Sequence, residues 1–244
     1  MSRAVISARP SLPRRIVAEA VGTAFLLAAV IGSGIMAERL SGGNVALALL
    51  ANTIATGAGL VALILTFGGI SGAHFNPAVT VADASQGGIP WRDVAPYVAA
   101  QVAGAFAGAG LAHLMFDAPV FSVSQHARSG LGQLAGEFTA TFGLVSVIGG
   151  CSRTRPSATP FAVAAYITAA YWFTSSTSFA NPAVTLARAT SDTFAGIRPA
   201  DVPGFIGAQV LGATSATLLF RWLVPNLPAL ADGVVAAGDK ENAA

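Results

Sequence analysis

The sequence Asn-Pro-Ala-Val-Thr occurs twice in this chain, at residues 76–80 and again at residues 181–185. A second group of residues repeats with it at constant internal spacing. Its first copy is Asp93-Val94, Gln101-Val102 and Gly104-Ala105, and its second copy is Asp201-Val202, Gln209-Val210 and Gly212-Ala213. Because the two repeats agree, we infer that the chain is a duplicated protein. Each half contributes one Asn-Pro-Ala sequence to the fold.

The composition of the chain is that of a membrane protein. Of its 244 residues, 54% are hydrophobic and 10% are charged, and the mean hydropathy is +0.66. In soluble domains about a quarter of the residues are charged. The net charge of +2 gives no indication of nucleic-acid binding, and the single cysteine, Cys151, allows no intrachain disulfide and belongs to no metal-binding motif. We therefore expect a lipid bilayer as partner, no nucleic acid, no cofactor and no metal site.

Six apolar stretches of about 20 residues are predicted to be transmembrane helices. They are approximately Ile16–Ala37, Val45–Gly68, Val94–Phe116, Gly130–Gly149, Ser157–Thr174 and Val202–Leu223, of which the fifth is the shortest. A short segment of helical character follows each Asn-Pro-Ala sequence, at Val79–Ala84 and at Val184–Thr190. Ten residues of helix rise about 15 Å, half the hydrocarbon thickness, so these segments are predicted to be re-entrant half-helices. The predicted fold class is an all-α membrane protein with six transmembrane helices and two half-helices.

Three spans in each half place the second half upside down relative to the first, as an inverted repeat. The basic residues favour cytoplasmic N- and C-termini, because more of them then face the cytoplasm than the outside. Those inside are Arg3, Arg9, Arg14, Arg15, Arg92, Arg153, Arg155, Arg221 and Lys240, and those outside are Arg39, Arg128, Arg188 and Arg198. We predict a multi-pass protein of the inner (plasma) membrane with cytoplasmic tails at residues 1–13 and 226–244. The membrane domain, 14–225, then contains repeats at about 14–116 and 130–225.

The Asn-Pro-Ala sequence has a direct physical interpretation. Asn is a preferred N-cap residue, and Pro is favoured in the first helical turn, where its missing N–H is not needed. Each copy should therefore begin a half-helix whose N-terminus carries a partial positive charge of about +0.5. The inverted repeat brings these two N-termini together at the bilayer midplane. Two positive helix ends beside a narrow water path repel cations, including hydronium.

Several longer motifs match a known family. They are Ser-Gly-Ala-His-Phe-Asn-Pro-Ala-Val-Thr at residues 71–80, Ala-Glu-Ala-Val-Gly-Thr at residues 18–23 and Gly-Glu-Phe-Thr-Ala-Thr at residues 136–141. On these motifs the chain resembles the aquaporin, or major intrinsic protein, family over about residues 14–224. The resemblance implies that residues 14–225 form an aquaporin-like channel and that the protein is a homotetramer with one pore in each subunit. It also implies that the pore residues include Asn76, Pro77, Ala78, Asn181, Pro182 and Ala183.

Two glutamates, Glu19 and Glu137, lie within predicted spans, where charge is costly. The resemblance implies that they accept hydrogen bonds from the backbone of the two re-entrant loops, although Glu19 could instead lie beside Arg15. Without a second ligand nearby, His74 is interpreted as a residue that shapes the loop at the cytoplasmic mouth. The equivalent glutamines are interpreted as hydrogen-bond partners between helices, and the spacing of Gly104 and Gly108 as a site of close helix packing. These two glutamines are Gln101 and Gln209.

The selectivity filter is where the chain departs from most members of the family. A gapless count from the two asparagines places the filter at Thr56, Ala169, Ser178 and Val184. The filter arginine of the family is thus replaced by Val184, and the count leaves no aromatic residue or histidine at these positions. In this respect the chain resembles a bacterial aquaglyceroporin-like branch without the filter arginine, some of whose members pass arsenite. Arg188 lies one helical turn beyond Val184, so we predict that it sits in the outer vestibule. The alternative is a structural role, in which Arg188 bonds loop carbonyls or Asp192, four residues further on.

These features predict a passive channel for small neutral solutes, including water, glycerol-like polyols and metalloid hydroxides such as arsenite. A strict water channel is an alternative, which requires loops to compensate for the small filter residues. An ion-coupled secondary transporter is a further alternative, because such proteins also use inverted repeats and broken helices. The sequence shows no nucleophile–base set and no metal cluster, so an enzyme is not expected.

Overall fold

The structure is a computed structural model that describes residues 10–224, except for the side chain at position 153. The predictions for the two tails therefore fall largely outside the described residues. The same holds for the cytoplasmic placement of Arg3, Arg9 and Lys240, and for the side chain of Arg153.

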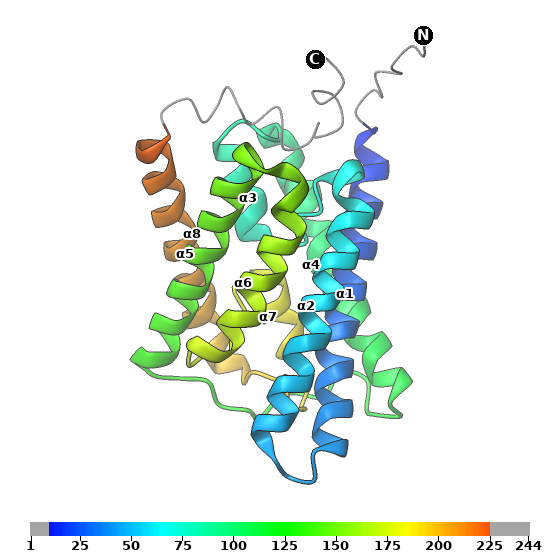
Figure 1. Ribbon diagram of the computed structural model, residues 1–244. Coiled ribbons are helices and arrows are strands. Elements are labelled where there is room, and N and C mark those ends of the chain that lie inside the picture. The colour runs from blue at the N-terminus through cyan, green and yellow to red at the C-terminus, as the bar shows by residue number, and fades with distance from the viewer. Residues whose placement is uncertain (1–9, 225–244) are drawn as a thin grey trace.

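The described part of the chain is all-α, as predicted (Figure 1). Its α-helices are α1 (Leu12–Leu40), α2 (Val45–Ser71), α3 (Pro77–Ser85), α4 (Trp91–Met115), α5 (Leu131–Thr154), α6 (Thr159–Phe173), α7 (Pro182–Arg188) and α8 (Val202–Leu223). Two short 3₁₀ turns precede α6 and α8, η1 (Pro156–Ala158) and η2 (Pro199–Asp201). Five of the helices are long and apolar enough to cross a membrane. The helix at the fifth predicted span, α6, has only 15 residues.

The long helices extend beyond some of the apolar stretches that predicted them. Helix α1, for example, begins at Leu12 rather than at Ile16. Pro13 occupies its first turn, where proline fits without the loss of a hydrogen bond. Arg15 in the same turn bonds Asp93 of α4 at 2.9 Å. The polar first turn of α1 is helical because its side chains bond residues of another helix. Hydropathy does not detect such bonds.

The two halves are built in the same way, with a tight pair of helices in each: α1 packs on α4, and α5 packs on α8. Glycine makes this close approach possible. A Cβ atom at Gly104 or Gly108 of α4 would lie 2.2 or 2.1 Å from a backbone oxygen of α1, and one at Gly212 of α8 would lie 2.5 Å from the carbonyl oxygen of Phe138 in α5. The two glycines of α4 thus make the close packing that their spacing predicts.

The half-helices α3 and α7 enter the bundle from opposite ends (Figure 1). Helix α3 lies in the upper part of the view, at the end of the bundle where α1 starts and α8 finishes, and α7 lies in the lower part. We call these two ends of the molecule the α3 end and the α7 end. Each half-helix begins in the interior and runs outward, so their N-termini meet inside the bundle. The arrangement is the predicted inverted repeat.

Candidate functional site

The two asparagines of the repeated sequence join the half-helices at the centre of the bundle. Asn76 and Asn181 are the N-cap residues of α3 and α7, in extended conformation with φ of −155° and −157°. Their Oδ1 atoms accept hydrogen bonds from the backbone N–H groups of Ala78 at 2.9 Å and of Ala183 at 3.0 Å. This is the capping chemistry that their sequence positions suggest.

The amide groups of these asparagines also cross between the two repeats. Nδ2 of Asn76 donates to the carbonyl oxygen of Ala180 at 2.7 Å, and Nδ2 of Asn181 donates to that of Phe75 at 2.8 Å. Each NH2 group has two hydrogens, and this contact uses one of them. Both asparagines line the central cavity.

Each re-entrant loop is held by one buried glutamate. The Glu19 carboxylate accepts from the backbone N–H groups of His74 at 3.0 Å and Phe75 at 2.7 Å. The Glu137 carboxylate accepts from Phe179 and Ala180, both at 2.8 Å. Both glutamates are completely buried. Arg15 does not take Glu19 as its partner, because its guanidinium bonds Asp93 and Tyr97 instead; these two residues lie on α4.

The repeated glutamines connect these carboxylates to the half-helices. Nε2 of Gln101 donates to Glu19 and to the hydroxyl of Thr80, both at 2.8 Å. Nε2 of Gln209 makes the equivalent bonds to Glu137 at 2.6 Å and to Thr185 at 2.8 Å. The two threonine hydroxyls in turn donate to the backbone oxygens of the N-cap asparagines. One buried polar network in each half thus runs from a long helix to the N-cap asparagine of a half-helix.

These networks hold a backbone that would otherwise be unfavourable. The residues three and one positions before each asparagine are Ala73, Phe75, Ser178 and Ala180, and their φ angles lie between 48° and 51°. A non-glycine residue in this left-handed region costs of the order of 1–3 kcal/mol. The carboxylate bonds to the loop N–H groups compensate for this cost, so the glutamates fix the loop shape on which the cavity depends.

A single cavity of about 140 Å³ passes the asparagines and continues along α2, α5 and α6. Its wall includes three of the four residues expected at the filter, Thr56, Ser178 and Val184. All three are buried, with 2 to 4% of their surface exposed. The fourth, Ala169, is exposed on the outside of α6 and is absent from the cavity wall.

Tyr171 takes the place that was expected for Ala169. The residues of α6 that line the cavity are Thr159, Val163, Ile167 and Tyr171, one per helical turn. The hydroxyl of Tyr171 lies 3.3 Å from the hydroxyl of Thr56. The gapless count was therefore wrong at this position, and so was the expectation that no aromatic residue remains. The signal that could have found Tyr171 is the four-residue period of α6, which does not depend on the length of the following loop.

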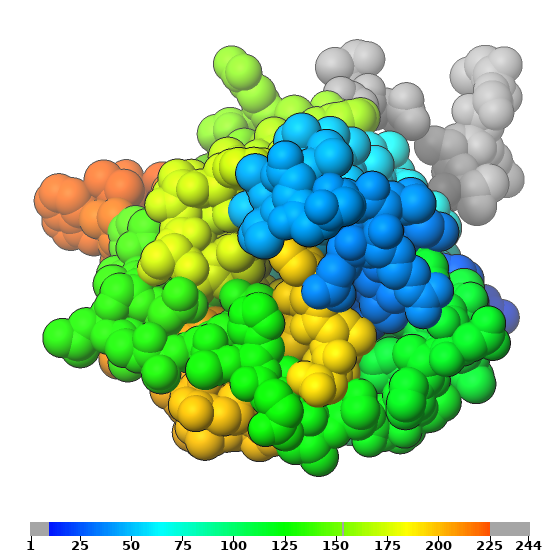
Figure 2. Space-filling model, turned by 90° about the horizontal axis from the view of Figure 1, so that it is seen from below, coloured from blue at the N-terminus to red at the C-terminus, as the bar shows by residue number. Residues whose placement is uncertain are grey.

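The α7 end of the cavity carries an arginine. Arg188 lines the cavity and is 2% exposed. Its guanidinium stacks on the ring of Phe179 at 3.3 Å from the centroid, and its Nε donates to the carbonyl oxygen of Ala195. Arg188 thus lines the cavity at its α7 end and is also bonded to a loop carbonyl, as the structural alternative for this residue predicts. Seen from this end, the segment that follows α7 lies near the middle of the face (Figure 2).

A second buried arginine, Arg128, supports this mouth and was not singled out by its sequence. Its guanidinium lies 4.9 Å from the centre of the Phe179 ring, and its Nε donates to the carbonyl oxygen of Gly196 at 2.7 Å. Its backbone N–H donates to the Asp201 carboxylate at 2.8 Å. Burial lowers the pKa of the Arg128 guanidinium to about 10, so it remains a cation at pH 7.

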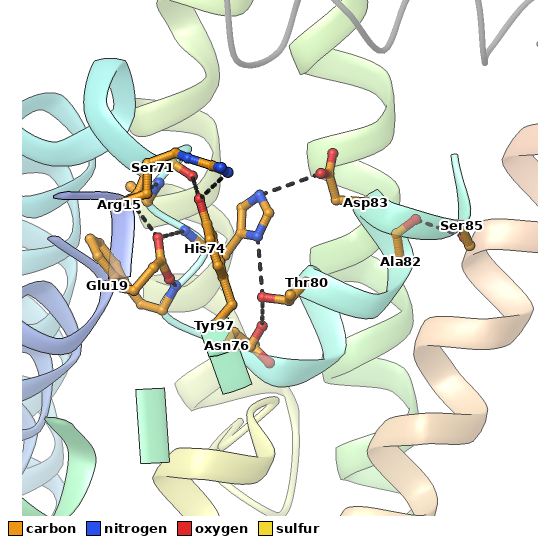
Figure 3. Close-up of polar contacts among 12 residues, drawn as sticks. Arg15, Glu19, Ser71, His74, Asn76, Thr80, Ala82, Asp83, Ser85 and Tyr97 are labelled. Carbon is orange, nitrogen blue, oxygen red and sulfur yellow. Dashed lines mark hydrogen bonds and ion pairs between the residues drawn. The ribbon is translucent and has the colours of Figure 1, made fainter. Parts of the chain in front are cut away.

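Figure 3 shows the polar residues at the α3 end of the cavity. Nδ1 of His74 lies 3.1 Å from the hydroxyl of Thr80, and its Nε2 lies 3.6 Å from Oδ2 of Asp83 (Figure 3). Both His74 and Asp83 line the cavity. Asp83 was not expected from the sequence. No group of three or more His, Cys, Asp or Glu residues that could hold a metal ion occurs within the described range 10–224.

Comparisons with known proteins agree with this geometry. The family model described as major intrinsic protein matches residues 7–167, which is more than half of the chain. The chain belongs to the major intrinsic protein family. This is a family of membrane channels and not of enzymes.

Individual relatives support the same assignment. The chain is 58% identical over 213 residues to the "Aquaglyceroporin AqpS" of Rhizobium meliloti (strain 1021), an alignment that covers 87% of this chain and 91% of that protein. It is 40% identical over 139 residues to "Aquaporin NIP1-3" of Oryza sativa subsp. japonica, covering 56% of this chain and 48% of that one. The X-ray structure of the aquaglyceroporin from Plasmodium falciparum has the same fold, with a TM-score of 0.63 at 20% identity over 90% of this chain and all of that one.

Proposed function

We propose that this family member is a passive channel for small neutral solutes: glycerol-like polyols, metalloid hydroxides such as arsenite, and water. The observation that carries the proposal is the composition of the cavity wall around the two asparagines. Beside Val184 the wall is formed by the polar residues Thr56, Tyr171 and Ser178 and by no charged side chain, and Arg188, the one arginine in the described part of the wall, lies a helical turn further out. The similarity to a protein named as an aquaglyceroporin supports the same conclusion.

The chemistry of this constriction suits solutes that carry several hydroxyl groups. A neutral polyol or trihydroxide presents hydroxyls on one side and leaves the rest of its surface to the apolar wall. Hydroxyls on the wall both donate and accept, so they match either orientation of such a solute. Tyr171 makes the opening narrower and more polar than an alanine would. The proposed filter is thus Thr56, Tyr171, Ser178 and Val184.

The arrangement in the cell follows the predicted orientation. We propose that residues 14–225 form the channel domain and that the α3 end faces the cytoplasm, together with both chain termini. The α7 end, with Arg188 in the outer vestibule, then faces outside. The excess of basic residues predicted on the cytoplasmic side supports this orientation. The proposed assembly is a homotetramer in the inner membrane with one pore in each subunit.

Proteoliposome swelling tests the function. Purified protein is reconstituted, and the rates of swelling are compared in gradients of glycerol, urea and arsenite, together with the rate of osmotic water flow. We expect glycerol and arsenite to pass well above the rate of protein-free vesicles, with flux proportional to the gradient and independent of sodium or proton gradients. Water flow without glycerol or arsenite flux would support the strict water channel instead. Flux that requires an ion gradient would support the secondary transporter.

A further inference from the structure

Each of the two asparagines is followed at the same sequence spacing by a charged residue, and the two charges are opposite. Asp83 lies seven residues after Asn76, and Arg188 lies seven residues after Asn181. Both line the central cavity, Asp83 at the α3 end and Arg188 at the α7 end. Of the described residues in the cavity wall, Asp83 is the one carboxylate.

The position of Asp83 is not explained by the stability of its own helix. Asp83 lies in the last turn of α3, which ends at Ser85. A helix C-terminus carries a partial negative charge, so an acidic residue there is unfavourable, whereas Arg188 in the last turn of α7 is favourable. A carboxylate that opposes its own helix dipole and faces a solute path is therefore a candidate for a functional role.

The carboxylate is also held in place. Oδ2 of Asp83 lies 3.6 Å from Nε2 of His74, and the two side chains point toward one another (Figure 3). On the other side it lies against Gly88, where a Cβ atom would come within 2.0 Å of Oδ1. Gly88 is thus the residue that leaves room for this carboxylate, and its own N–H donates to the carbonyl oxygen of Asp83 at 3.0 Å.

A negative charge at the α3 end of the cavity opposes an attraction for anions that the two half-helices create. The N-termini of α3 and α7 meet at its centre, and their partial positive charges repel cations but attract anions. Arg188 at the α7 end adds to this attraction. A channel that passes only neutral solutes therefore needs something that acts against anions. We propose that Asp83 is this element: its negative charge at the α3 mouth excludes small anions from the cavity.

The proposal rests on the proposed passage of neutral solutes, and two separate measurements distinguish them. Proteoliposomes are loaded with potassium nitrate, and the nitrate permeability is measured under a potassium diffusion potential set by valinomycin. Glycerol swelling is measured on the same vesicles. A wild-type protein that fails to conduct glycerol would contradict the proposed function. The nitrate measurement, normalised to glycerol flux, tests the role of Asp83.

Asp83→Asn removes the charge with little change of shape, and we expect the ratio of nitrate to glycerol permeability to rise about tenfold. Asp83→Glu keeps the charge and should retain low nitrate permeability. Asp117→Asn is the matched control, because Asp117 is exposed at the other end of the molecule and has a φ of 53°, which asparagine tolerates. It should behave as the wild type does.

An Asp83→Asn channel that conducts glycerol normally and remains as tight to nitrate as the wild type would overturn the proposal. Exclusion of anions would then come from the cost of removing their water in a largely apolar cavity. If Asp83→Asn yields no folded protein, Asp83→Ser serves the same purpose, because it removes the charge with a smaller side chain. The expected rise and the refuting result are then the same.

Discussion

Replacing Glu137 by glutamine tests whether one buried carboxylate fixes the second re-entrant loop. The carboxylate accepts hydrogen bonds from the backbone N–H groups of Phe179 and Ala180 at 2.8 Å, from Nε2 of Gln209 at 2.6 Å and from the side chain of Ser176. Glutamine has nearly the same shape but only one oxygen. Its NH2 group must therefore face at least one of these donors, and that donor remains unpaired in the interior.

The expected loss of stability follows from these bonds. A hydrogen bond to a charged group contributes about 1.5–3 kcal/mol, and a buried donor that is left unpaired costs about 1–3 kcal/mol. With one bond lost and the others weakened by the loss of charge, we expect Glu137→Gln to lower the free energy of unfolding by about 2–4 kcal/mol. At about 2–4 °C per kcal/mol for a chain of this size, the melting temperature should fall by roughly 5–15 °C.

The assay is thermal unfolding of the purified protein in detergent, followed by tryptophan fluorescence, with solute flux measured at matched protein amounts in vesicles. Glu38→Gln is the control, because Glu38 is exposed at the end of α1. We also expect the glycerol-to-water flux ratio to change, because Ser178 and Asn181 lie in and beside the loop that Glu137 holds. A melting temperature within 2 °C of wild type, with an unchanged flux ratio, would refute the idea that the Glu137 carboxylate determines the conformation of the second re-entrant loop.

Three further predictions follow from the cavity and the helix packing. Val184→Arg should reduce glycerol flux more than water flux in stopped-flow swelling, because it adds a bulky cationic donor to the cavity wall; an unchanged ratio at matched expression would contradict the proposed filter. Asn181→Asp should raise potassium leakage, because it places a carboxylate where two positive helix ends meet; a variant that conducts glycerol and stays tight to potassium would argue against electrostatic exclusion there. Gly108→Ala should lower the melting temperature, since its Cβ would lie 2.1 Å from a carbonyl oxygen of α1, and overpacking costs about 1–3 kcal/mol. Gly207→Ala, with nothing within 4 Å of the new Cβ, is its control, and equal melting temperatures for the two would count against tight packing.

The features that depend on local chemistry could be predicted from the sequence. Apolar stretches of sufficient length located the membrane helices, because the bilayer interior demands apolar side chains and an internally bonded backbone. Asn followed by Pro located the starts of α3 and α7, because an N-cap is formed by residues adjacent in sequence. The duplication then determined that the two halves have opposite orientations. Glu19 and Glu137 stood out because charge at membrane depth needs a partner.

Only the tertiary structure decided which residues lie at the two ends of the cavity and on the α6 side of the proposed filter. Tyr171 rather than Ala169 faces the cavity because the orientation of α6, and not a count along the following loop, determines which side points inward. Asp83 meets His74 because the loop before α3 places the His74 ring between Thr80 and Asp83 of that helix. Arg128 reaches Phe179 from a connection 51 residues earlier in the chain (179 minus 128). The sequence by itself thus predicted the five long membrane helices and the starts of α3 and α7, since these depend on neighbouring residues. The identity of the groups that face a solute depended on contacts between distant segments, which no local pattern encodes.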